Sequence, residues 1–145
     1  MAAAIGVCVA AVYYILNLRN QIQSRKAQLF MQLGEHLMDQ AETKSHYEIL
    51  YEWEWKDLDD FQRKYGLGNM ENFSKFLCFG VLLQHVGELL ELKLIDNGTA
   101  RGQFSHRLSR FYEKYETIIE EGRKLLQSPG LWAGIDRLYN EWSSR

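Results

Sequence analysis

The chain has 145 residues, which is room for one domain with an appendage. Apolar residues make up 46% of it and charged residues 25%, a composition that excludes a disordered tail. The net charge of −2 gives no overall basic field for nucleic acid, and two cysteines are too few for a disulfide framework or a four-thiolate zinc site.

Charge is unevenly distributed along the chain. Residues 1–18 contain no Lys, Arg, Asp or Glu, and the basic residues Arg19, Arg25 and Lys26 follow them. All 19 acidic residues and the other 14 basic residues come later, so residues 27–145 carry a net charge of −5. An uncharged segment, a short basic segment and an acidic remainder therefore follow one another.

The uncharged segment Ala2–Leu18 reads AAAIGVCVAAVYYILNL. As a helix it would be about 26 Å long, and the shortest spanning helices have about 17 residues. Tyr13 and Tyr14 lie shortly before Arg19, where an aromatic belt is expected. We predict a transmembrane anchor over residues 1–18, with the N-terminus outside and the C-terminal domain cytoplasmic, because the basic residues follow the anchor.

Two alternatives to an anchor remain for this segment. A cleaved signal peptide would need a basic start and small residues after the apolar run, where Tyr, Ile and Leu stand instead. A fully buried core helix would also be apolar on every side. The small residues Ala2, Gly6 and Ala10 recur every four positions, a spacing that lets a second membrane helix approach closely.

Good helix formers continue beyond the apolar segment, so one helix is predicted from residue 2 to about residue 42. Residues 19–42 would form a juxtamembrane helix that continues into the domain. Its apolar residues fall near one helical stripe: Ile22, Leu29, Leu33 and Leu37. A rigid exit of this kind would hold the domain close to the bilayer.

Residues 43–145 are predicted to form a cytoplasmic bundle, so the fold class is all-α with an antiparallel bundle of four to five helices. No alternating strand pattern interrupts the helical periodicity. Ser128-Pro129 predicts the start of the last helix. The predicted helices after residue 42 are Ser45–Tyr65, a helix from Asn69 or Asn72 to Ile95, Thr99–Gln127 and Ser128–Trp142.

The segment Phe76–Leu83 is apolar on all sides and too short to span a membrane, so its helix is expected to be the central and most buried one. Any side of it left uncovered would bind a partner. Trp53 and Trp55 are two positions apart and cannot share one helix face, so one of them should be more exposed. The candidate partner interface comprises Trp53, Trp55, Phe76 and Phe79.

The stretch FLCFGVLLQHVGELLELKLIDNG (Phe76–Gly98) resembles a motif of a large prokaryotic family with one N-terminal membrane helix and a small helical domain, catalogued as a domain of unknown function. Trp53–Gly66, Phe111–Leu125 and the closing LWAGIDRLYNEW are similar to its pattern as well. The sequence departs from that pattern at Gln84–Lys93, where the helix is longer and more acidic. The resemblance implies the anchor and the bundle, and it implies no catalytic residues.

Di-metal carboxylate bundles carry two Glu-x-x-His motifs, which this sequence lacks. His85, Glu88 and Glu91 could line one helix face and hold a metal, or make ordinary helix-surface contacts. Phosphate-loop, dinucleotide and hydrolase motifs are absent. We therefore predict no catalytic, cofactor-binding or metal site, and no nucleic-acid partner.

A local basic patch is predicted on the fourth helix. It would touch phospholipid headgroups if it faced the membrane, or it would pair with nearby glutamates on a solvated face. Its members are Arg101, His106, Arg107 and Arg110.

These observations favour a non-catalytic, single-pass membrane protein that acts as an accessory or scaffold subunit of a larger membrane protein complex. Its partners would be the lipid bilayer and other integral membrane proteins. The alternative is a membrane-tethered sensor or regulator that binds a small ligand within the bundle. A cavity lined by Tyr and His would favour the sensor, and a filled core would favour the scaffold.

Overall fold

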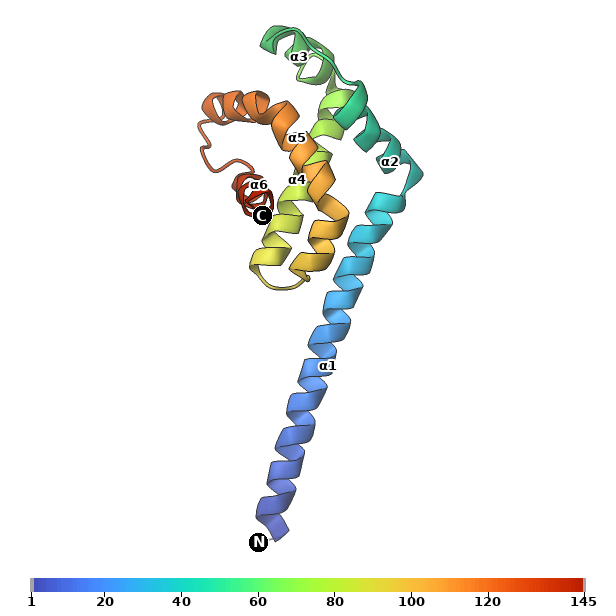
Figure 1. Ribbon diagram of the computed structural model, residues 1–145, viewed down its shortest axis with the longest axis vertical. Coiled ribbons are helices and arrows are strands. Elements are labelled where there is room, and N and C mark those ends of the chain that lie inside the picture. The colour runs from blue at the N-terminus through green and yellow to red at the C-terminus, as the bar shows by residue number, and fades with distance from the viewer. Residues whose placement is uncertain (1, 145) are drawn as a thin grey trace.

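The computed structural model describes residues 2–144, apart from the side chains of residues 2–5, 36 and 38. Over this range the chain forms six α-helices, one short π-helix and no strand. The first helix is a rod that projects far beyond the bundle made by the other helices (Figure 1). The all-helical class and the helical bundle are confirmed, and the helices are more numerous than predicted.

Helix α1 (Ala2–Met38) is continuous across the predicted boundary between anchor and juxtamembrane segment. It ends four residues earlier than expected, because Asp39 leaves the helical conformation with ψ of 129°. The Asp39 carboxylate accepts hydrogen bonds from the backbone N–H groups of Ala41 (2.9 Å) and Glu42 (3.1 Å). Asp39 is thus the N-cap of α2 (Gln40–Tyr47), a position that Asp favours over a helix interior.

The single helix predicted over Ser45–Tyr65 is wrong. The chain forms α2, the π-helix η1 (Glu48–Glu52), an extended link and then α3 (Leu58–Tyr65). The link begins at Trp53, whose backbone is extended, and the Trp53 ring stacks on Tyr65 at 4.2 Å between ring centroids. Folding the segment back in this way buries aromatic rings that one straight helix would have pointed in different directions.

Helices α4 (Met70–Glu91) and α5 (Asn97–Leu125) lie close to their predicted ranges. Asn69 is the N-cap of α4, and its side chain accepts a hydrogen bond from the backbone N–H of Asn72. Asp96 is the N-cap of α5, and its carboxylate accepts one from the backbone N–H of Thr99. Helix α6 (Ala133–Ser143) begins later than the Ser128-Pro129 pair predicted. The chain makes a turn there in which Trp132 adopts a left-handed φ of 55°, and this turn brings the buried Trp132 ring against α4.

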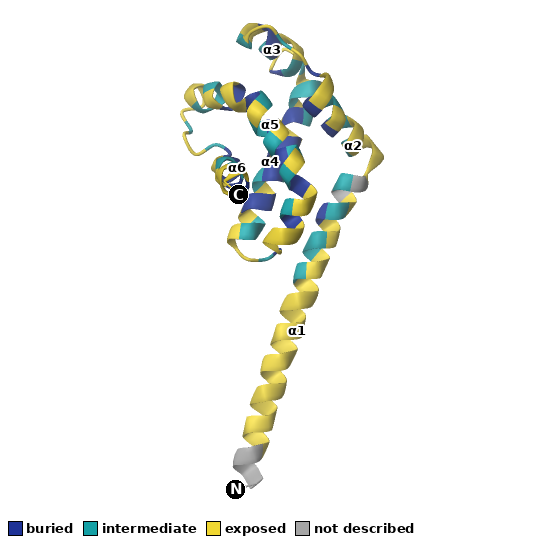
Figure 2. Ribbon diagram, in the orientation of Figure 1, coloured by how far each residue is buried: buried dark blue, intermediate teal, exposed yellow. Residues whose placement is uncertain are grey.

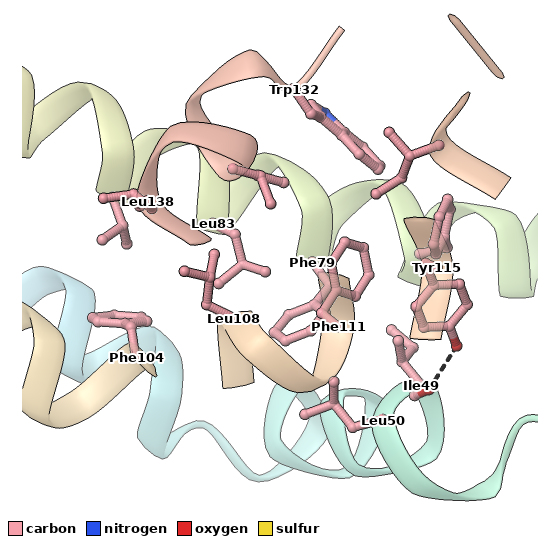
Figure 3. Packing of buried hydrophobic residues seen from close by; sticks show 14 of the residues in the cluster. Ile49, Leu50, Phe79, Leu83, Phe104, Leu108, Phe111, Tyr115, Trp132 and Leu138 are labelled. Atoms are coloured by element: carbon pink, nitrogen blue, oxygen red, sulfur yellow. Dashed lines mark hydrogen bonds between the residues drawn. The ribbon is translucent and has the colours of Figure 1, made fainter. Parts of the chain in front are cut away.

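The core is formed mainly by large aromatic and aliphatic side chains from η1, α4, α5 and α6 (Figure 3). Phe79 and Phe111 meet edge to face with ring centroids 5.1 Å apart. Helix α4 is not buried on every side, contrary to prediction. Leu77 is 39% exposed and Val81 43% exposed, because no helix covers that side of α4.

Glycines allow α4 and α6 to approach closely. A Cβ atom at Gly80 would clash with the Trp132 ring, and one at Gly87 would lie 3.2 Å from the carbonyl oxygen of Gly134. The Gly134 N–H donates to the Gln84 side chain at 3.0 Å. The two glycines of α4, seven residues apart on one face, therefore form a flat surface on which α6 packs.

Candidate functional site

From residue 6, where the described side chains begin, the N-terminal half of α1 is exposed on all its faces (Figure 2). Val7, Val9 and Ile15, which point in different directions around the helix, are 69%, 63% and 61% exposed. The predicted span residues Gly6, Ala10, Tyr13, Tyr14 and Leu18 are all exposed as well, whereas the side chain of Ala2 lies outside the described residues. This half of α1 is thus an apolar surface that the chain itself does not cover.

The predicted basic segment lies where α1 comes alongside the bundle. Arg19 and Arg25 are exposed, and Lys26 is the first half-buried residue of the helix. Beyond it, Leu29 and Leu33 pack against the hydrophobic core. Helix α1 is therefore exposed on all sides before Lys26, and beyond Lys26 one side of it packs against the bundle.

Among the residues whose side chains the structure describes, one helix is long and apolar enough to cross a bilayer, and it is α4 rather than α1. A third of its apolar window is buried inside the bundle, and Phe79, Leu83 and Val86 are completely buried. Length and composition of one helix are weak evidence for a span, since the core helix of a soluble protein has the same properties. Core packing accounts for the buried part of α4, whereas Leu77 and Val81 remain exposed.

The candidate partner interface is wrong for three of its four residues. Trp53, Phe76 and Phe79 are at most 5% exposed and belong to the core. Trp55 is half-buried and stacks on Tyr115 at 5.1 Å between ring centroids. One tryptophan is indeed less buried than the other, but these rings pack within the domain because the chain folds back after η1.

A hollow with a volume of about 770 Å³ lies at the end of the bundle from which the α1 rod leaves (Figure 1). Its walls come from α1, the turn between α4 and α5, and α6. We call it the membrane-side hollow, after the anchor predicted from the sequence, which would put the membrane on this side of the bundle. Apolar side chains including Ala27, Phe30, Leu90 and Ile95 line part of it.

Charged groups of both signs also line the membrane-side hollow. Arg137 and Glu91 form an ion pair of 2.8 Å, so they neutralise each other. Asp96 accepts hydrogen bonds from the backbone N–H and the hydroxyl of Thr99, which hold the pKa of Asp96 below its ordinary value, with a smaller contribution from Lys26. Lys26 lines the same hollow as Asp96, and no ion pair among the described residues joins them.

A smaller pocket of about 240 Å³ lies between α2, η1 and α5. The Tyr51 hydroxyl and the Nε2 atom of His106 are hydrogen-bonded at 2.8 Å, and the Arg110 guanidinium lies 4.6 Å from the centre of the Tyr51 ring. His46 is buried beside Phe79, and burial lowers the pKa of its imidazole. We call this the tyrosine–histidine pocket; its lining includes His46, Tyr47, Tyr51, His106 and Arg107.

The predicted basic patch does not form one surface. Arg101 donates to the carbonyl oxygen of Trp142 in α6 at 3.0 Å, whereas His106 and Arg110 contact Tyr51 in η1. Arg107 donates to the carbonyl oxygen of Gln103 in its own helix at 2.9 Å. Arg101 therefore contacts a different neighbouring element from His106 and Arg110.

The possible metal ligands of α4 do not converge. His85 and Glu88 are 4.0 Å apart, but Glu91 pairs with Arg137 of α6. No group of three or more His, Cys, Asp or Glu side chains that could hold a metal ion occurs in the described part of the chain.

No protein-family model, curated protein or solved structure matches this chain. The resemblance to the prokaryotic membrane-anchored family therefore remains a prediction.

Sequence reasoning missed both the membrane-side hollow and the tyrosine–histidine pocket. Each combines residues far apart in sequence, such as Lys26 with Asp96, or Tyr51 with His106. The local signals were visible, since Asp96-Asn97-Gly98 is a turn and Tyr47 and Tyr51 are one helical turn apart. The sequence did not indicate which other helices these residues would face.

Proposed function

We propose that this protein is a non-catalytic, single-pass membrane protein that acts as an accessory or scaffold subunit of a larger membrane protein complex. The observation that carries the proposal is the N-terminal half of α1, which exposes apolar side chains in every direction. Helices of soluble proteins gain most of their stability by packing an apolar face, whereas the described side chains of this half of α1, from residue 6 onward, are all exposed.

A lipid bilayer would cover these exposed apolar side chains. Five exposed aliphatic side chains, from Val7 to Leu16, would each gain about 2 kcal/mol on leaving water. Arg19, Arg25 and Lys26 come after the apolar segment, and this order favours an N-terminus outside and a cytoplasmic bundle. The anchor in this proposal is Ala2–Leu18, and α4 belongs to the bundle.

The scaffold role is supported by two features of the described residues. The core is filled with large side chains, and the larger of the two hollows described above opens at its edge rather than within it. On α1, a Cβ atom added at Gly6 would meet no neighbouring atom within 4 Å, so a second helix can approach this glycine directly. Gly6 and Ala10 lie on one face of α1, and we propose that a helix of a partner protein packs there.

The test is to extract the full-length protein from its native membrane in a mild detergent and measure the mass and composition of what remains bound. We expect a stable assembly with other integral membrane proteins at fixed stoichiometry. Gly6→Ile with Ala10→Ile should release the partners, and the matched Val12→Leu on the opposite face should retain them. A wild-type protein that runs alone, as monomer or homo-oligomer, contradicts the proposal.

A second candidate function is a membrane-tethered sensor. The tyrosine–histidine pocket favours it, because polar groups of three elements converge on one small concave surface. A soluble ligand would then raise the melting temperature of the wild type and not that of Arg107→Ala. If no class of small metabolite raises the melting temperature of the wild type alone, the sensor function is excluded in favour of the scaffold.

A further inference from the structure

The position of the membrane-side hollow relates it to the anchor. Lys26, in its wall, follows Leu18 by eight residues, which is about 12 Å along α1. The turn between α4 and α5 forms another wall, and this turn is at the end of the bundle nearest the projecting rod (Figure 1). With Ala2–Leu18 in the bilayer, the hollow is on the side of the bundle that faces the leaflet from which α1 emerges.

The charges of the hollow are balanced. Three cations, Lys26, Lys93 and Arg137, and three carboxylates, Glu91, Asp96 and Glu141, line it. An acidic lipid therefore meets no net positive charge there, unlike at a polybasic patch. The ion pair of Arg137 with Glu91 leaves two cations and two carboxylates for a ligand.

The remaining charges are not joined to one another. Among the described residues, neither Lys26 nor Lys93 forms an ion pair with a carboxylate. Glu141 accepts one long hydrogen bond of 3.5 Å from the Asn97 side chain. Asp96 accepts its two hydrogen bonds from Thr99, and neither carboxylate is paired with a cation in the described part of the chain. Charges of opposite sign without ion pairs, on the walls of one open hollow, suit a ligand that carries both charges itself.

We infer that the membrane-side hollow binds the phosphoethanolamine headgroup of a membrane lipid, with the phosphate at Lys26 and Lys93 and the ammonium at Asp96 and Glu141. The inference rests on the proposed anchor, which places the hollow beside the bilayer. A primary ammonium has three N–H donors for the two carboxylates, whereas the quaternary ammonium of a choline headgroup has none. The site therefore distinguishes ethanolamine from choline lipids, and it would hold the bundle in one orientation on the membrane.

The test exposes delipidated full-length protein, in mild detergent, to equimolar phosphatidylethanolamine, phosphatidylcholine and phosphatidylglycerol, and measures retained lipid by native mass spectrometry. We expect phosphatidylethanolamine to be retained about tenfold better than the other two, as charge-assisted hydrogen bonds allow. Lys26→Gln and Asp96→Asn should each abolish this preference. Asn is also a good N-cap, so Asp96→Asn should preserve α5.

Two matched variants serve as controls. Arg25→Gln removes the neighbouring cation outside the hollow, and Asp39→Asn changes an N-cap aspartate in another helix. Both should keep the preference for phosphatidylethanolamine. Equal retention of the three lipids, greater retention of phosphatidylglycerol, or a preference that survives Lys26→Gln and Asp96→Asn would overturn the inference.

Soluble glycerophosphoethanolamine separates a lipid from a free metabolite. We expect it to compete weakly with phosphatidylethanolamine, because it lacks the acyl chains that hold a lipid beside α1. If it binds the protein as tightly as the lipid does, the lipid assignment is overturned. Failure of the anchor itself would appear differently, as loss of the full-length protein from membranes on fractionation, whatever its headgroup preference in detergent.

Discussion

The Tyr115 hydroxyl of α5 donates a hydrogen bond of 2.6 Å to the backbone carbonyl of Ile49 in η1 (Figure 3). The Lys114 ammonium donates to the same carbonyl at 3.1 Å. Carbonyl groups of the π-helix are thus bound by side chains of α5, and both Ile49 and Leu50 remain buried in the core. Burial raises the pKa of Tyr115 far above its ordinary value, so the hydroxyl remains a donor at all physiological pH values.

Tyr115→Phe should lower the free energy of unfolding by about 1 kcal/mol, because the Ile49 carbonyl loses one of its two side-chain donors. Chemical denaturation of the full-length protein measures this. Tyr112→Phe is the matched control, since the Tyr112 ring stacks on Tyr139 while no hydrogen bond of its hydroxyl occurs among the described residues. Equal effects of the two substitutions would show that the Tyr115 hydroxyl has no special role.

Gly80→Ala should destabilise the bundle by about 1–3 kcal/mol, because the added methyl group collides with the Trp132 ring and forces α4 and α6 apart. Gly102→Ala is the same substitution in α5 at a position with nothing within 4 Å, and it should stabilise the protein by roughly 0.5–1 kcal/mol. Thermal unfolding of the two variants should therefore move in opposite directions. A stabilising Gly80→Ala is incompatible with the packing of Trp132 described above.

Asp60 should make stability depend on acidic pH. Its carboxylate accepts hydrogen bonds from Lys64 (2.8 Å), Arg63 (2.6 Å) and the Lys56 backbone (3.1 Å), and these hold its pKa well below the ordinary value. The folded pKa is thus lower than the unfolded value of about 3.9, so the stabilisation is complete above that pH and is lost as the pH falls towards the folded pKa.

Asp60→Asn should accordingly lower the melting temperature at pH 7, and the difference from wild type should shrink below about pH 4. The neighbouring Asp59 is exposed, and Asp59→Asn should change the melting temperature little at either pH. A difference for Asp60→Asn that stays constant down to about pH 2 would contradict the assigned role of the ionised carboxylate.

The two halves of α1 should respond differently to the same substitution. Leu33 is 8% exposed and packs on the core, so Leu33→Ala should cost about 2–3 kcal/mol of unfolding free energy. Leu18 is 40% exposed, and Leu18→Ala should change the stability of the bundle by no more than about 0.5 kcal/mol. Comparable losses for both leucines would mean that the rod contributes to the fold along its whole length.

The helical class, the long first helix and the limits of α4 and α5 could be predicted because they depend on local periodicity and capping. The break at Asp39 was missed although its cause is local, the capping of α2 by the Asp39 carboxylate. The extended link at Trp53 could not be predicted, because it depends on which aromatic rings the core accepts. The partners that hold Trp53 and Trp55 in place are Phe61 and Tyr65 of α3 and Tyr115 of α5, and Tyr115 is far away in sequence. The late start of α6 also depends on a tertiary contact, because the turn before α6 packs the Trp132 ring against Gly80 of α4.

The candidate sites also depend on contacts between residues far apart in sequence, which the sequence alone did not reveal. The basic residues after the apolar segment were evident from composition, but the aspartate opposite Lys26 comes from a turn 70 residues later. Trp53, Phe76 and Phe79 were expected at a partner interface because aromatic residues are common there, and they are instead the interior of the domain. Residue type alone did not distinguish these two environments.

The two free cysteines provide the most direct test of the central claim, that Ala2–Leu18 and not α4 lies in the bilayer. Both are exposed in the structure, Cys8 on the rod and Cys78 on the uncovered side of α4. Single-cysteine variants, Cys8→Ala and Cys78→Ala, are treated with a membrane-impermeant maleimide in sealed vesicles of known orientation. Denatured protein gives the total reactive thiol in each case.

We predict that Cys78 reacts only when the cytoplasmic side faces the reagent, and that Cys8 reacts in neither orientation until the membrane is dissolved. Rapid labelling of Cys8 together with protection of Cys78 would place α4 in the bilayer and contradict the account.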